Sequence, residues 1–140
     1  MNKKLMVAML MMMALAVLLI GCAQPSAPPS LEGTSWMLTS LNGSSPIAGS
    51  EITLDFEGGE GTGSAGCNSY FGSYTVEGAD KLTFSAIAST EMACLEPEGI
   101  MEQETEYLDT LRAATGFRLS DGELQILSAG GGLLVFSQAQ

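Results

Sequence analysis

The chain of 140 residues contains no histidine, and its five lysine and arginine residues face 16 aspartate and glutamate residues. Without histidine, the Ser-His-Asp and Cys-His nucleophile systems, the zinc-protease helix and most transition-metal sites are excluded. The net charge of −11 argues against a nucleic-acid surface, because neutralising phosphates requires clustered basic side chains. We therefore expect no catalytic residue, no metal and no cofactor, and we expect that the protein is not an enzyme.

Residues 1–21 have the organisation of an export signal. Lys3 and Lys4 are followed by an uncharged stretch of sixteen residues, Leu5–Ile20, rich in Met, Leu, Ala and Val. The alternative is a permanent membrane-spanning helix. This stretch is at the short end of the roughly 20 apolar residues that a span needs, so its length alone does not decide between the two.

The end of this segment, Leu19-Ile20-Gly21-Cys22, resembles the lipobox of prokaryotic lipoproteins. The resemblance implies that Cys22 receives a diacylglyceryl group and becomes the new N-terminus, so that a lipid anchor holds the protein to a membrane. Residues 22–30 contain three prolines and no charge, which predicts an extended tether. The residue after the cysteine is Ala23. It is not the Asp that resembles an inner-membrane retention signal in some bacteria with two membranes, which favours the outer membrane if the host has one. We therefore expect an extracytoplasmic, lipid-anchored protein.

Removal of residues 1–21 takes away two basic residues and no acidic one. Three basic and 16 acidic residues remain, a net charge of −13 over 119 residues. Anionic lipid headgroups would repel such a domain, which is compatible with a tether that keeps it off the bilayer. The remaining length suits one domain, residues 31–140, which we expect to be a monomer.

That domain is predicted to be mostly β-strand. From Leu31 onward, apolar residues alternate or form short runs between clusters of Gly, Asn, Asp and Ser. We predict strands at Ser35–Leu41, Ile52–Phe56, Gly72–Val76, Lys81–Ser85, Ile87–Thr90, Phe117–Leu119, Leu124–Ser128 and Leu133–Ser137. Turn sequences imply antiparallel hairpins at Asn42-Gly43, Asp121-Gly122 and Gly130-Gly131-Gly132.

One segment, Glu98–Ala114, departs from this pattern and predicts a helix. Leu108 and Leu111 recur near helical spacing, and Pro97 suits the first turn. Four glutamates near its start suit the positive end of the helix dipole and predict a solvated face in preference to an interaction surface: Glu96, Glu98, Glu102 and Glu104. Strands on both sides of one helix predict a mainly β fold, a small antiparallel barrel of about eight strands capped by the helix.

Two motifs suggest ligands but have the wrong context. Gly61-Thr62-Gly63-Ser64-Ala65-Gly66 matches the spacing of a dinucleotide-binding loop, yet glycine and aromatic residues follow it where a helix would be required. Asp55, Glu57 and Glu60 offer oxygen ligands to calcium but lack the alternation of a calcium-binding loop. We assign neither a dinucleotide nor a metal to them.

Cys67 and Cys94 remain once Cys22 is acylated. An even number of thiols in an oxidising compartment favours a disulfide between them. The alternative is two separate buried thiols that behave as small hydrophobic side chains.

A family resemblance covers about Leu31 to Phe136. It rests on these blocks: Trp36-Met37-Leu38, Ile52-Thr53-Leu54-Asp55-Phe56, Gly63-Ser64-Ala65-Gly66-Cys67-Asn68, Gly72-Ser73-Tyr74 and Thr90-Glu91-Met92-Ala93-Cys94. In this order they resemble the META domain family of HslJ-like lipoproteins. The resemblance implies a lipocalin-like barrel with one helix and a loose link to envelope stress, novobiocin tolerance, motility or secretion. It brings no catalytic residues.

The residues that carry the resemblance also have local physical interpretations. Trp36, the only tryptophan, lies in the first predicted strand and is expected to anchor the core. Asn68 can satisfy backbone groups of a turn, and Thr90 and Met92 flank a segment that we expect to pack. We treat the whole set as structural: Trp36, Gly66, Asn68, Tyr74, Thr90 and Met92.

Two hypotheses about function remain. The first is a non-catalytic structural or interaction module with an unknown envelope protein as its partner. The second is a barrel that holds a lipid or another apolar small molecule. A filled core would exclude the second hypothesis, and large residues are available to fill it: Trp36, Leu54, Phe56, Phe84, Leu108, Leu111, Phe117, Ile126, Leu134 and Phe136.

Overall fold

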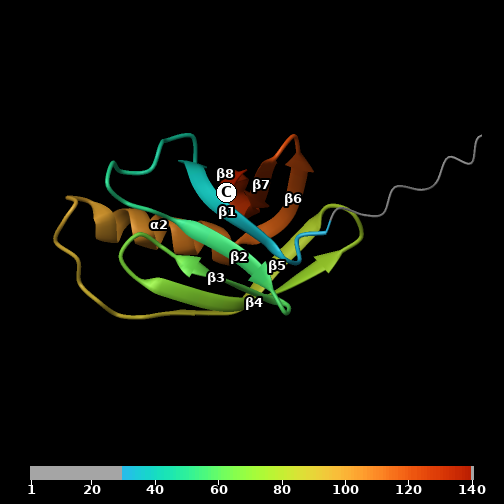
Figure 1. The fold of residues 1–140 in the computed structure, drawn as a ribbon, viewed down its shortest axis with the longest axis horizontal. Coiled ribbons are helices and arrows are strands. Elements are labelled where there is room, and N and C mark those ends of the chain that lie inside the picture. Colours follow the sequence, from blue (N-terminus) through green and yellow to red (C-terminus); the bar gives the residue numbers. More distant parts are fainter. Residues whose placement is uncertain (1–29, 140) are drawn as a thin grey trace, which may run out of the picture.

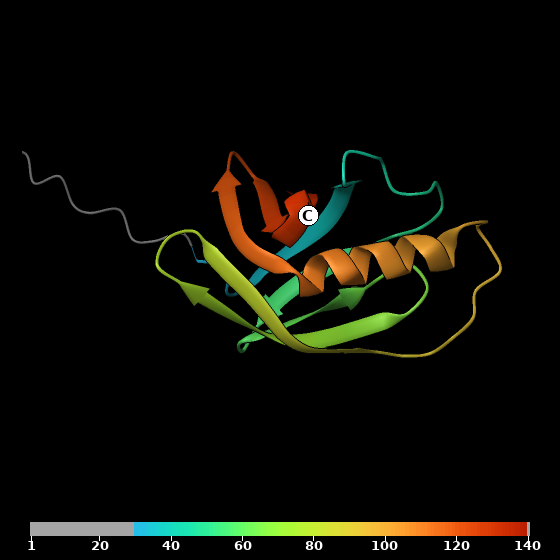
Figure 2. The same ribbon diagram turned by 180° about the vertical axis from the view of Figure 1, so that it is seen from behind.

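The computed structural model describes residues 30–139, in which eight antiparallel strands curl into a nearly closed barrel (Figures 1 and 2). The strands are β1 (Thr34–Leu41), β2 (Thr53–Glu57), β3 (Glu60–Ser64), β4 (Ser69–Glu77), β5 (Lys81–Ser89), β6 (Ala114–Ser120), β7 (Glu123–Ser128) and β8 (Leu133–Gln138). The α-helix of this part of the chain is α2 (Ile100–Arg112), and a short 3-10 turn, η2 (Ala129–Gly131), joins β7 to β8. The predicted fold class is confirmed.

The strand order is β5-β4-β3-β2-β1-β8-β7-β6, so β5 and β6 are the two ends of the sheet. These ends approach each other, and the Phe117 N–H donates to the Asp80 carbonyl at 2.7 Å. Elsewhere α2 lies between the two ends of the sheet and packs against β5, β7 and β8 (Figure 2). The helix therefore covers the opening that the strands leave, which removes part of two exposed sheet edges.

Most predicted strands lie within a few residues of the observed ones. The clearest turn prediction is also confirmed: Asp121 and Gly122 join β6 to β7 with φ angles of 52° and 77°. Both angles are positive, as a two-residue turn with the twist of the flanking strands requires. Alternation of apolar and polar residues and a strong turn dipeptide thus placed this half of the sheet correctly.

Four sequence predictions were wrong in detail. Strand β3 was missed because its glycines have low strand propensity. The two strands predicted over residues 81–90 are a single strand, β5. Its pairing with β4 shifts register at Ala86, whose φ is 53°. Asn42-Gly43 forms a tight turn from Leu41 to Ser44 but does not join β1 directly to β2. The helix begins at Ile100, after Gly99 with a φ of 84°, so Pro97 precedes its first turn.

Side chains from seven of the eight strands and from α2 fill the interior of the barrel, whereas β3 contributes the buried Gly61. All ten residues predicted to point inward are buried. Aromatic rings meet edge to face, with centroids 4.8 Å apart for Phe56 and Tyr74 and 5.6 Å apart for Tyr70 and Tyr107. The large side chains with less than 2% exposure are Tyr107, Phe56, Phe117, Phe136, Leu31, Ile52, Leu54, Leu82, Leu111, Leu124, Ile126 and Leu134.

The glycines of β3 permit close approach to neighbouring groups. A Cβ atom on Gly61 would lie 2.7 Å from the Phe84 ring, and one on Gly63 would lie 2.1 Å from the Thr53 carbonyl oxygen. The spacing that resembles a dinucleotide-binding loop therefore has a steric cause: it lies in a strand and in the turn to the next strand, without the helix that a phosphate would need.

We predict that Gly63→Ala destabilises the protein, because the Thr53 backbone must move to admit the methyl group. The free energy of unfolding should fall by about 1 to 3 kcal/mol. Urea denaturation measures it, with Thr62→Ala in the same strand as the control. Equal stability of the two variants would contradict this account of β3.

Candidate functional site

Four of the residues that carry the family resemblance, Cys67, Asn68, Thr90 and Met92, converge with Glu104 where the β3–β4 turn, the segment after β5 and α2 meet. We call this group the Asn68 cluster: Cys67, Asn68, Thr90, Met92 and Glu104. Thr90 and Met92 follow β5, while Glu104 lies on α2. These three segments are far apart in the sequence, and one amide side chain links all of them.

The Asn68 side chain is 2% exposed and uses its full hydrogen-bonding capacity. Its Nδ2 donates to the Met92 carbonyl at 3.0 Å and to Glu104 Oε1 at 2.7 Å. Its Oδ1 accepts from Thr90 Oγ1 and from the Met92 N–H, both at 2.7 Å. The prediction that Asn68 satisfies backbone groups of a turn agrees with the Met92 contacts. The hydrogen bond from Asn68 to Glu104 on the helix was not predicted.

Glu104 was predicted to lie on a solvated helix face, and this is wrong. Its residue is 6% exposed, and its carboxylate accepts three hydrogen bonds. Oε2 accepts from the N–H groups of Cys67 at 3.2 Å and Asn68 at 2.6 Å, and Oε1 accepts from Asn68 Nδ2. Helical spacing could have revealed it, because position 104 shares one face with Ile100 and Leu108.

Cys67 and Cys94 form a disulfide, with the sulfur atoms 2.01 Å apart. It joins the β3–β4 turn to the segment between β5 and α2, which we call the stapled loop, Thr90–Glu98. Closing a loop of about 28 residues constrains the unfolded chain by roughly 3.5 kcal/mol in the chain-entropy model. The bond and the Asn68 side chain therefore hold the same segment at two points.

Gly66 allows the cluster to lie close to the helix. Its φ is 111°, and a Cβ atom would lie 3.0 Å from Ile100 Cδ1. Next to it on α2, Gln103 accepts from the Ile47 N–H at 2.6 Å and donates to Ser50 Oγ at 2.9 Å. The first turns of α2 are thus fixed on one side by the Asn68 cluster and on the other by the loop before β2.

Trp36 and Tyr74 lie apart from the cluster. Trp36 is 2% exposed and donates from Nε1 to Thr34 Oγ1 at 2.7 Å. The Tyr74 hydroxyl donates to Glu32 Oε2 at 2.6 Å. Partial burial and this hydrogen bond raise the pKa of Tyr74 to about 12, and the same bond lowers the pKa of Glu32. Trp36 and Tyr74 thus each stabilise the barrel, and they do not contribute to one common site.

Two tyrosines meet inside the barrel. The hydroxyl oxygens of Tyr70 and Tyr107 are 2.6 Å apart, and Tyr70 donates to the Thr53 carbonyl at 2.8 Å. Burial raises the pKa of both phenols, so both stay neutral at ordinary pH. Their polar ends are satisfied by each other and by backbone, as buried phenols require.

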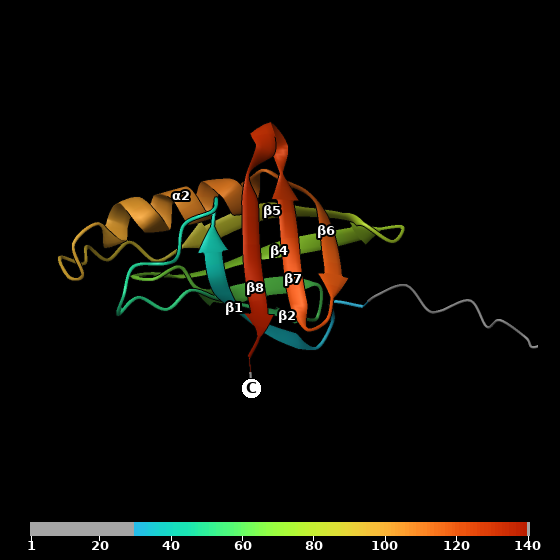
Figure 3. The same ribbon diagram turned by 90° about the horizontal axis from the view of Figure 1, so that it is seen from above.

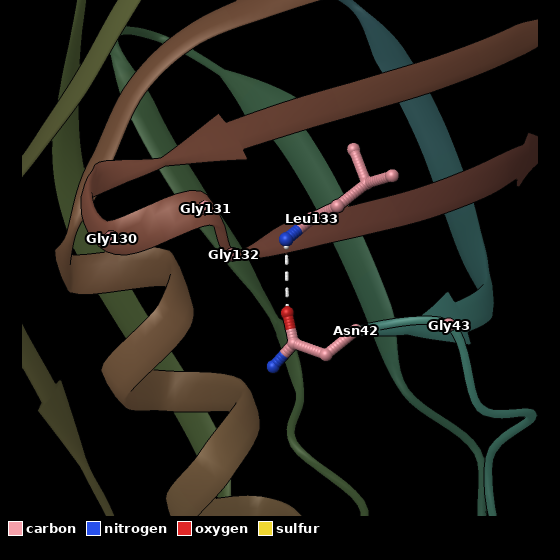
Figure 4. A pocket seen from close by; sticks show the side chains of 6 residues that line it. All are labelled: Asn42, Gly43, Gly130, Gly131, Gly132 and Leu133. Atoms are coloured by element: carbon pink, nitrogen blue, oxygen red, sulfur yellow. Dashed lines mark hydrogen bonds between the residues drawn. The ribbon is translucent and has the colours of Figure 1, made fainter.

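The surface also carries a hollow of about 480 Å³ between the β1 turn and η2 (Figure 4). Asn42 lies at its edge and accepts from the Leu133 N–H at 2.9 Å, while its Nδ2 donates to Glu106 at 2.8 Å. Besides Asn42 and Leu133, the residues that line the hollow are Gly43, Gly130, Gly131 and Gly132. Mostly backbone lines this hollow, so it offers no acid, base or nucleophile.

The acidic residues considered for calcium do not converge. Glu57 lies opposite Glu60 at the β2–β3 turn, and Asp55 lies opposite Thr62. Over residues 30–139, no group of three or more Cys, Asp or Glu side chains is placed to hold a metal ion. None of the helices in this part of the chain has the length and the apolar content of a membrane span. Cys22 and the predicted signal and tether lie outside the described residues, apart from Ser30.

We predict that Glu104→Gln destabilises the protein although it keeps the size of the side chain. The new amide has an NH2 group in place of one oxygen, so at least one buried N–H donor loses its acceptor. The free energy of unfolding should fall by about 1 to 3 kcal/mol. In thermal or urea denaturation the exposed Glu102→Gln on the same helix should lose less than about 1 kcal/mol, and a similar loss in both variants would contradict this role.

Solved structures resemble this one over most of their length. A protein from Burkholderia xenovorans, solved by NMR, has a TM-score of 0.62 and 28% identity and covers 86% of this chain and 97% of its own. A second NMR structure has a TM-score of 0.57 at 22% identity, with 74% and 87% covered. A DUF4847 family protein from Bacteroides vulgatus has a TM-score of 0.56 at 15% identity, with 75% and 92% covered. The last two likenesses support the fold alone.

No curated protein matches the chain. Residues 29–140, however, match the META domain. This range contains every residue of the Asn68 cluster and all eight strands. The chain therefore belongs to the META domain family.

Proposed function

We propose that the protein is a lipid-anchored, non-catalytic interaction module of the cell envelope. The lipobox-like sequence ending at Cys22 and the proline-containing stretch after it support the anchor and the tether. Both features lie in the sequence before β1, which begins at Thr34. A tethered domain of this kind acts by contact with other envelope components.

One observation carries the proposal: the residues most specific to the family resemblance hold the barrel together through their hydrogen bonds and the disulfide. Every hydrogen-bonding position of the Asn68 side chain has a partner, and three donors surround the Glu104 carboxylate. Cys67 and Cys94 are joined to each other. Groups committed in this way are not free to perform chemistry on a substrate, so the outer surface is left to carry the function.

The packing of the interior favours the same choice over a ligand-binding barrel. A barrel that holds a lipid needs interior volume that its own side chains do not occupy. Here twelve large side chains with less than 2% exposure lie inside, among them Tyr107, Phe56 and Phe136. A cargo would have to displace several of them, at a cost in buried apolar surface.

We predict that Cys22→Ser abolishes lipid attachment. In cells that make the full chain, labelled palmitate should enter the wild-type protein, and the protein should sediment with membranes. The label should be absent from Cys22→Ser, because the serine hydroxyl cannot form the thioether. Cys67→Ser should keep the label, because Cys67 lies in the barrel. An unlabelled wild type, or a labelled Cys22→Ser variant, would contradict the anchor.

A further inference from the structure

The stapled loop exposes apolar side chains to solvent. Leu95 is 88% exposed and Met92 is 56% exposed, so the prediction that the segment flanked by Thr90 and Met92 packs is wrong. The other large hydrophobic residues that the structure exposes are Met37 at 40% and Phe71 at 54%. Half of this set therefore lies within four residues of one short loop. Exposed apolar groups gathered in one place mark sites of protein interaction more often than scattered ones do.

The backbone of the loop is fixed at Met92 and at Cys94. Met92 is bound to Asn68 through both its N–H and its carbonyl group, and Cys94 is joined to Cys67. The Cys94 N–H also lies 3.4 Å from Met101 Sδ on the helix. Binding of a partner would therefore cost little conformational entropy of the loop backbone, which is the advantage of a pre-organised contact.

The charge around the loop has a single sign. Glu91, Glu96 and Glu98 are exposed on the loop, and Glu102 is exposed in the first turn of α2. The basic residues of the described range lie elsewhere: Lys81 begins β5, Arg118 is in β6, and Arg112 ends α2, where it pairs with Asp109 at 3.0 Å. The apolar side chains thus have an acidic rim.

We propose that the stapled loop docks into an apolar groove on an envelope protein whose rim carries lysine or arginine. The proposal rests on the proposed function as an interaction module. Apolar anchors within a rim of complementary charge are the usual arrangement of a specific interface. A second copy of this chain is disfavoured because each copy has a net charge of −13 once residues 1–21 are removed, and anionic lipid is disfavoured for the same reason.

The position of the loop supports this occupant. Figures 1 and 3 show it at one end of the long axis, at the start of α2, while the described chain begins at the opposite end. A domain tethered through its N-terminal side would present the loop away from the membrane. The exposed Phe71 lies near the start of the loop, because it pairs with Ala88 and because the Ser69 carbonyl, two residues earlier, accepts from the Thr90 N–H.

Site-specific photo-crosslinking in cells tests the proposal with the full chain. A benzophenone amino acid replaces Leu95, and the same group at Met37 and at the exposed Thr83 provides matched positions. The triple variant Glu91→Lys, Glu96→Lys and Glu98→Lys removes the acidic rim. The control, Glu60→Lys, Glu77→Lys and Glu123→Lys, changes the net charge equally at exposed positions outside the loop.

We expect one discrete protein adduct from Leu95, with lysine or arginine beside the linked residue of the partner when the adduct is mapped by mass spectrometry. Its yield should fall about tenfold in the rim variant and stay unchanged in the control. An adduct with lipid, with a second copy or with equal yield in both triple variants would overturn the proposal. Protein adducts from Met37 or Thr83 alone would overturn this surface and keep the interaction module, whereas no protein adduct from any position would contradict both.

Discussion

The structure depends on the contact between one buried carboxylate and one buried amide. Glu104 reaches from α2 to Asn68, and Asn68 reaches onward to Met92. A buried carboxylate is costly unless donors surround it, and here two backbone N–H groups and the Asn68 amide do so. The helix is thereby fixed over the gap in the barrel, and the loop before the helix is fixed with it.

This arrangement explains the two most specific blocks of the family resemblance in physical terms. The Gly-Cys-Asn block supplies a glycine that lets the turn approach Ile100, a disulfide partner and the linking amide. The block from Thr90 to Cys94 supplies a hydroxyl, a peptide group and the other sulfur atom. Both blocks serve to position one loop, and the exposed Leu95 follows directly after the second block.

The sequence predicted those features that depend on local patterns. Alternation located most strands, Asp121-Gly122 located a turn, and large apolar residues at alternate positions identified the core. Features that depend on contacts between distant segments were missed. Strand β3 has glycines because Thr53 and Phe84 lie against it, and Glu104 is buried because donors from a distant turn meet it. Neither cause is visible within a short window of sequence.

Because these contacts join them, the β3–β4 turn, the stapled loop and α2 should open as one unit. Native-state hydrogen exchange of the amides of Asn68, Met92 and Leu108 measures this, because the first two donate within the cluster and the third lies in the helix. We expect one common opening free energy for the three amides. Rapid exchange at Asn68 and Met92 while Leu108 stays protected would contradict it.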